Sequence, residues 1–178
     1  LDTLKKSIDS FISALRWDGV GLLYYTGRAF QVGGQNFLLS VDGSSDAGSG
    51  SAVEKSIALS PLMDRMNSAQ NQLNLVILNT AYSDPSGRSP NGDKPGLAAM
   101  SVKPHTFFLS SAPPDVMYPS AFSEKQIFVH QLIPLMEQEN LPMSRLGTTL
   151  QVNLMAASSN QMTPWALDQL AGTYRLEN

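Results

Sequence analysis

The residues able to do chemistry are few in this chain of 178 residues, and cysteine is absent. Without cysteine the chain has no disulfide, no thiolate metal ligand and no cysteine nucleophile. Its two histidines, His105 and His130, stand at no spacing typical of a metal site. Ser83 and Asp84 lie together and could supply a nucleophile and an acid, with His105 as the base of a hydrolase. A serine without a base beside it is a poor nucleophile, and the sequence places no histidine next to Ser83.

Two positions that follow apolar runs are better placed for a site. Arg28 follows the run 19–25, and Ala81 follows the run 73–78. Short apolar runs are typical of strands buried on both faces of a parallel sheet, and ligand sites lie beyond the carboxyl ends of such strands. The guanidinium of Arg28 has no lone pair and cannot act as a general base, although it can bind a carboxylate. An exposed loop position or an ion pair is the simpler explanation of Arg28, and Ala81 offers no nucleophile.

Helical and extended patterns alternate along the chain. Helices are expected over 1–16, 60–69, 123–136 and 144–158. Strands are expected over 19–25, 36–41, 73–78, 106–109 and 173–176. Ser60 and Ser123 are the expected N-caps of their helices, and Pro134 predicts a kink or break in the second of these. Gly33-Gly34 predicts a hairpin turn, and the stretches 42–51 and 84–96 are expected to be loops.

The alternation of helices with apolar strands predicts the fold class. We expect an α/β protein, a three-layer α/β/α sandwich around a mostly parallel sheet, with a single domain over 1–178. The net charge is −3 and Lys and Arg form no cluster, so nucleic acid is not an expected partner. No apolar run approaches the roughly 20 residues that span a bilayer. The first residues lack a signal-peptide pattern and do not include an initiating Met, so a longer parent protein is expected.

The motifs and their order resemble the caspase-like superfamily of caspases, metacaspases and bacterial orthocaspases. Bacterial members carry a strand ending Tyr-Tyr-Ser-Gly-His-Gly, then a glutamine and a hairpin ending Ile-Pro-Val-Asp. The corresponding segments here are YYTGRAFQ at 24–31 and NFLLSVD at 36–42. The family's cysteine strand ends Leu-Asp-Ala-Cys-Arg, and here it reads LNTAY at 78–82. Segments 96–98 and 107–113 resemble the small-subunit half, and 161–165 with 170–174 is similar to the closing segments of bacterial members.

This resemblance implies a peptidase fold without its catalytic dyad. Arg28 stands where the family carries the catalytic histidine, Ala81 where it carries the cysteine, and Asn79 where metacaspases carry an acid that recognises a basic substrate residue. The His-strand half then covers about 1–84, a loop covers 85–96, and the small-subunit-like half covers 97–178. We therefore expect an inactive pseudopeptidase, with an engineered exchange in an active cysteine peptidase as the alternative explanation of Ala81. The former substrate cleft, which is expected to bind a protein or peptide partner, consists of Arg28, Ala29, Asn79, Thr80 and Tyr82.

The resemblance also implies that the first strand, helix and strand of the fold are missing from this chain. Because the first of these strands normally lies inside the sheet, the run 19–25 is expected to present an open apolar edge that another segment fills. The expected partners are that amino-terminal segment, an active caspase-like relative, or a second copy that pairs through the last strand of the sheet. A folded spacer without a ligand is the remaining alternative, and no cofactor is expected.

Overall fold

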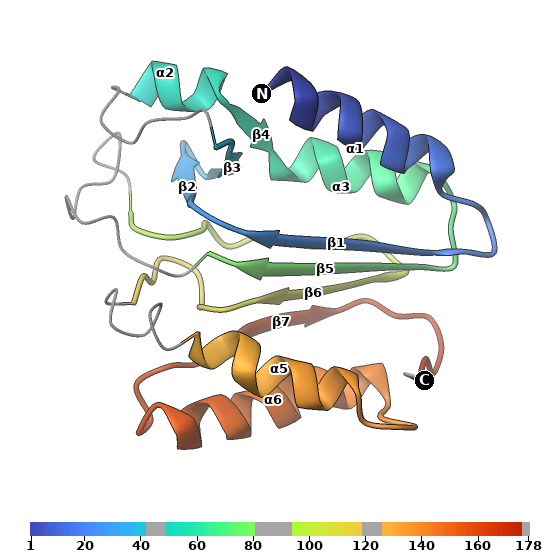
Figure 1. Cartoon of the computed structure of the whole chain (residues 1–178), viewed down its shortest axis with the longest axis vertical. Coiled ribbons are helices and arrows are strands. Elements are labelled where there is room, and N and C mark those ends of the chain that lie inside the picture. The colour runs from blue at the N-terminus through green and yellow to red at the C-terminus, as the bar shows by residue number, and fades with distance from the viewer. Residues whose placement is uncertain (42–48, 81–93, 119–125, 176–178) are drawn as a thin grey trace.

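A four-stranded sheet forms the centre of the computed structural model, which describes residues 1–41, 49–80, 94–118 and 126–175 (Figure 1). The strands lie in the order β1 (Val20–Thr26), β5 (Leu73–Asn79), β6 (Thr106–Ser110) and β7 (Trp165–Asp168). β1, β5 and β6 run parallel, and β7 is antiparallel to β6. The prediction of a mostly parallel sheet in an α/β protein is therefore confirmed.

Helices cover both faces of this sheet (Figure 1). α1 (Asp2–Ala14) and α3 (Leu59–Ser68) lie on one face, and α5 (Ile127–Met136) and α6 (Met143–Ala157) lie on the other. None of the helices in the described part of the chain is long and apolar enough to cross a membrane. The arrangement is compatible with the expected three layers.

A second, smaller sheet continues from the carboxyl end of β1. It is antiparallel and consists of β2 (Ala29–Val32), β3 (Gln35–Leu39) and β4 (Ser56–Ala58) in that order. The predicted hairpin around Gly33-Gly34 is confirmed by the pairing of β2 with β3. The expected loop over 42–51 is wrong at its end, because α2 (Ser49–Glu54) already begins there, while residues 42–48 lie outside the described part.

The apolar core has two halves, one on each face of the central sheet. Every residue of β5 and of β6 is buried. Because successive side chains of a strand point to opposite faces, Leu75 and Ile77 pack toward α5 and α6, whereas Val76 and Leu78 pack toward α3. Gly147 lets α6 approach the sheet closely, since a Cβ at that position would lie 2.7 Å from the Cβ of Ala166.

Three local predictions are wrong in position. α3 begins at Leu59 after Ala58 as N-cap and has no side-chain cap bond, so Ser60 is not the cap. α5 is not broken at Pro134, because this proline falls in the last turn, and the Ser123 cap lies outside the described residues. The last strand of the sheet is β7 rather than 173–176, where Arg175 makes only an isolated bridge to Pro142.

Candidate functional site

The predicted site residues meet at the carboxyl end of the central sheet. Thr26 at the end of β1 lies opposite Asn79 at the end of β5, and the Gly27 amide donates a hydrogen bond to the Asn79 carbonyl over 3.4 Å. Arg28 and Ala29 follow β1 directly, as Thr80 follows β5. The structure therefore brings Arg28, Ala29, Asn79 and Thr80 to one end of the sheet, and Ala81 and Tyr82 lie outside the described residues.

Asn79 and Thr80 form a buried polar floor at this end. The Thr80 amide donates to Ser111 Oγ over 3.1 Å, so part of this floor is fixed by hydrogen bonds. Within the described part of the chain, Asn79 Oδ1 is buried and has no hydrogen-bond partner. Leaving a buried acceptor unpaired costs about 1–3 kcal/mol, so Asn79 offers an acceptor to any donor that reaches it.

Arg28 lies on the rim of a hollow of about 880 Å³ beside this floor. The first turns of α1, the end of β1 and residues 39–41 line the hollow. Tyr25 joins these elements, because its hydroxyl donates to the Leu39 carbonyl over 2.7 Å and lies 2.8 Å from the Arg28 carbonyl. Burial raises the pKa of Tyr25 to about 12, so this phenol stays neutral and acts as a donor at ordinary pH. Ser40 Oγ, also in the lining, is a second buried polar atom without a partner among the described residues.

A charged cluster ties β2 to Lys94, which precedes β6, and to Asp115, which follows β6. Asp115 accepts hydrogen bonds from Lys94 Nζ over 2.5 Å and from Gln31 Nε2 over 3.0 Å. These two bonds, with Lys94 the larger influence, lower the pKa of Asp115. Neither Lys94 nor Asp115 could be predicted from the sequence, because both are far from Gln31 along the chain and belong to no periodic pattern.

His105 lies at the opposite, amino end of the sheet. Its carbonyl accepts a hydrogen bond from the Asn74 amide over 2.7 Å, at the start of β5. Asn74 and Asn79 are five residues apart on one strand, a separation of about 16 Å. The described residues therefore do not bring His105 to the end where Arg28 lies. The proposed hydrolase stays a prediction, since Ser83 and Asp84 lie outside the described residues.

The outer edge of β1 is the second notable feature of this region. Among the described strands β1 pairs only with β5, so it is the edge strand of the sheet. Val20, Leu22 and Tyr24 are 56%, 49% and 45% exposed, and we call these three side chains the β1 face. The prediction of a strand buried on both faces is wrong here, because the helices on this side of the sheet leave the β1 face uncovered. The expected open apolar edge is present, and no described segment fills it.

Comparison with known proteins does not assign this chain to a family. No family model matches the chain, and no curated protein matches it either. The class that the fold defines is thus a mixed α/β protein with a mostly parallel sheet, and the caspase-like resemblance stays an expectation based on motifs.

Proposed function

We propose that this chain is a catalytically inactive, caspase-like protein-binding module whose β1 edge receives an extended segment of polypeptide. The observation that carries this proposal is that no segment in the described part of the chain pairs with the outer edge of β1. Edge strands of monomeric proteins are normally blunted by lysine, proline, a bulge or a covering element. β1 contains neither Lys nor Pro, its register with β5 is unbroken over seven residues, and its face is half exposed.

Strand addition suits such an edge physically. The unpaired backbone groups of β1 supply affinity, and the β1 face supplies specificity for apolar side chains at alternate positions. Completely burying a side chain such as valine or leucine contributes about 1.5–3 kcal/mol, so covering three half-exposed ones contributes a few kcal/mol. Apolar side chains that are exposed side by side commonly mark a site of interaction with another protein.

The occupant we propose is an extended segment with apolar residues at every second position. The caspase-like resemblance gives its source as the strand, helix and strand that precede β1 in the family, supplied by the same polypeptide or by a relative. β1 carries no charged side chain, so pairing an apolar strand with it would bury no charge of β1. A helix that accompanies this segment would also cover the β1 face.

The carboxyl end of the sheet supports a binding role rather than catalysis. Arg28 can hold a carboxylate of the bound segment, and Asn79 Oδ1 and Ser40 Oγ are buried atoms without a hydrogen-bond partner among the described residues. Neither a guanidinium nor an amide can accept the proton of a nucleophile, so neither replaces the dyad histidine.

Site-directed cross-linking of the protein as its gene encodes it tests the proposal. Residues 1–178 contain no cysteine, so Leu22→Cys places the one thiol of this chain on the β1 face. A photoactivated cross-linker on this thiol is expected to capture one defined segment with alternating apolar residues, identified by mass spectrometry. Val152→Cys is the matched control, because Val152 is 68% exposed on α6.

Two outcomes would overturn the proposal. Equal and unspecific capture from Leu22→Cys and Val152→Cys would show that β1 is an ordinary surface. Capture of residues 20–26 of a second copy would show a homodimer through β1 instead of the proposed occupant. Loss of capture in Tyr24→Lys, with the fold retained, would support the assigned edge.

A separate experiment tests the resemblance itself. In the double variant Arg28→His with Ala81→Cys, the resemblance predicts an imidazole beside a thiol. A neighbouring imidazolium lowers the pKa of a thiol, so alkylation by iodoacetamide should stay fast at lower pH than in the control Arg28→Ala with Ala81→Cys, which has no cation at position 28. Identical pH profiles for the two variants would contradict the caspase-like assignment of these positions.

A further inference from the structure

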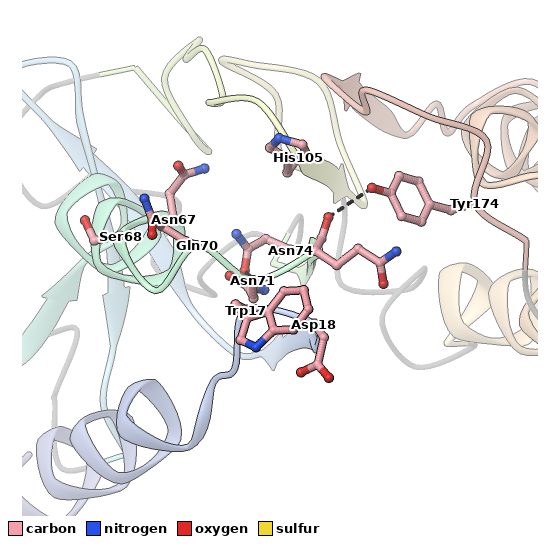
Figure 2. Close-up of a pocket in the computed structure, with 10 residues that line it drawn as sticks. Trp17, Asp18, Asn67, Ser68, Gln70, Asn71, Asn74, His105 and Tyr174 are labelled. Carbon is pink, nitrogen blue, oxygen red and sulfur yellow. Dashed lines mark hydrogen bonds between the residues drawn. The ribbon is translucent and has the colours of Figure 1, made fainter.

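A second hollow lies at the amino end of the central sheet, far from Arg28. Its volume is about 780 Å³, and five of its lining residues are asparagine or glutamine. Figure 2 shows Trp17 and Asp18 on one side, His105 on the other, and Asn71 and Asn74 between them. The protein-binding function proposed above does not use this hollow, which we call the amide hollow.

Separate elements bring these side chains together. Trp17 and Asp18 precede β1, Asn71 belongs to the connection from α3 to β5, and Asn74 lies in β5. Gly21 leaves room for the two buried amides, because a Cβ there would lie 2.9 Å from Asn74 Oδ1 and 3.1 Å from Asn71 Nδ2. The hollow is therefore a product of the fold and of a glycine in β1.

Asn71 is the observation that points to a ligand. It is 5% exposed, and its Nδ2 donates to the Leu73 carbonyl over 2.7 Å and to Asn74 Oδ1 over 2.8 Å. These two bonds fix the amide, and its Oδ1 is left without a hydrogen-bond partner among the described residues. Buried carbonyl oxygens normally accept a hydrogen bond, so a donor is missing at the floor of the amide hollow.

The lining limits the chemistry of that ligand. It contains no lysine or arginine, and its one histidine, His105, is accompanied by the carboxylate of Asp18, so an anion finds no permanent counter-charge there. It also contains no aliphatic or methionine side chain, so an apolar ligand or the side-chain anchors of a peptide find no pocket. Side-chain amides both donate and accept hydrogen bonds, which matches a ligand rich in hydroxyl groups.

The exposed side chain of Trp17 also suits a ligand that contains a sugar ring. Its indole is 78% exposed at the rim of the hollow, an unusual position for so large an apolar surface. The negative face of an aromatic ring attracts the slightly positive C–H groups on the flat side of a sugar ring. Tyr174, whose hydroxyl donates to the Gln72 carbonyl over 3.0 Å, forms another part of the wall (Figure 2).

We propose that the amide hollow is a binding site for a neutral saccharide, in which Trp17 stacks on a sugar ring and the amides and Asp18 bind its hydroxyl groups. The site is independent of the β1 edge, because it lies at the end of the sheet and does not include the β1 face.

Saturation-transfer NMR with three neutral disaccharides, cellobiose, maltose and N,N′-diacetylchitobiose, tests the site at millimolar concentration. At least one of them is expected to receive saturation on its ring C–H protons. Trp17→Ala should weaken this binding by about tenfold or more, which corresponds to about 1.4 kcal/mol. Because Trp17 is so exposed, this variant retains the fold, which circular dichroism checks.

Val152→Ala is the control, since it removes an exposed apolar side chain of α6 that lies outside both the hollow and the β1 face. It should bind as the unaltered protein does, and Gln72→Ala, at an exposed position of the lining, should weaken binding. The proposal fails if none of the three disaccharides shows transfer that Trp17→Ala removes. A tetra-asparagine peptide that binds through Trp17 while the sugars do not would also overturn it, because the hollow would then recognise peptide amides.

Discussion

Tyr25 connects three parts of the carboxyl end through one hydroxyl group. It lies in β1, its hydroxyl reaches the carbonyl groups of Arg28 and Leu39, and its ring contacts the core under α1. A phenol in this position holds the start of β2 and the end of β3 next to β1. The geometry around Arg28 therefore depends on a neighbour that performs no chemistry.

The exchange Tyr25→Phe is expected to lower the free energy of unfolding by about 1 kcal/mol, because it removes the hydroxyl that donates to the Leu39 carbonyl. Urea denaturation measures this difference. Tyr24→Phe is the control, since Tyr24 lies in the adjacent position on the exposed face. An equal effect in both variants would show that the Tyr25 hydroxyl contributes nothing.

Tyr25 also predicts a dependence of stability on pH. Its pKa in the folded protein, about 12, exceeds the ordinary value of 10.0. The unfolded state therefore loses its proton first, so the stabilisation is complete below pH 10 and declines as the pH rises through 12. Denaturation across this pH range should show that the free energy of unfolding falls more steeply with rising pH in the unaltered protein than in Tyr25→Phe. Parallel curves for the two proteins would contradict the raised pKa.

Sequence reasoning placed some of the site residues correctly. Arg28 and Asn79 could be assigned to one end of a sheet because each follows an apolar run, and parallel strands end at the same edge. Lys94 and Asp115 could not be found, because only the folded chain brings them to Gln31. The amide hollow was missed for a related reason, since its polar residues look like ordinary loop composition in the sequence.

The strands differ in how well their environment could be predicted. β5 and β6 were recognised because burial on both faces leaves them apolar throughout. β1 is also mostly apolar, but the sequence does not show that it pairs with only one of the described strands. β7 was missed because it is short and alternates between half-buried and exposed residues.

At the scale of elements, the exposed β1 edge predicts self-association of this chain in isolation. Leu22→Lys should reduce light scattering at high protein concentration, because a lysine on an edge strand disfavours pairing with another edge. The free energy of unfolding should change by no more than about 0.5 kcal/mol, since Leu22 is half exposed. Val152→Lys is the control, and an equal reduction in scattering there would assign the effect to net charge alone.

At the scale of the whole molecule, the small sheet is attached to the rest through Asn36. Its Oδ1 accepts a hydrogen bond from the Ala98 amide over 2.7 Å, and its Nδ2 donates to the Ala98 carbonyl over 3.0 Å. This side chain pairs with segment 94–100 as a backbone strand would. The Asn36 side chain and the backbone of Ala98 are both buried, so each supplies the hydrogen bonds that the other needs.

The exchange Asn36→Ala is expected to cost about 2–4 kcal/mol, because two buried backbone groups lose their partners at once. Thermal denaturation measures the loss, with Gln35→Ala, at an exposed neighbouring position, as the control. A loss no larger than that of Gln35→Ala would show that water replaces Asn36 and that the small sheet is held in another way.

The pairing of β1 with β5 has a consequence for the order of events in folding. Val20 pairs with Leu73 and Thr106 pairs with Asn74, whereas β2 and β3 are joined by a tight turn. Contacts between distant parts of a chain form slowly, and a hairpin forms within microseconds. The β2–β3 hairpin is therefore expected to form long before the central sheet. During that interval the open edge of β1 is accessible, so a strand synthesised shortly before it would have the first opportunity to pair with it.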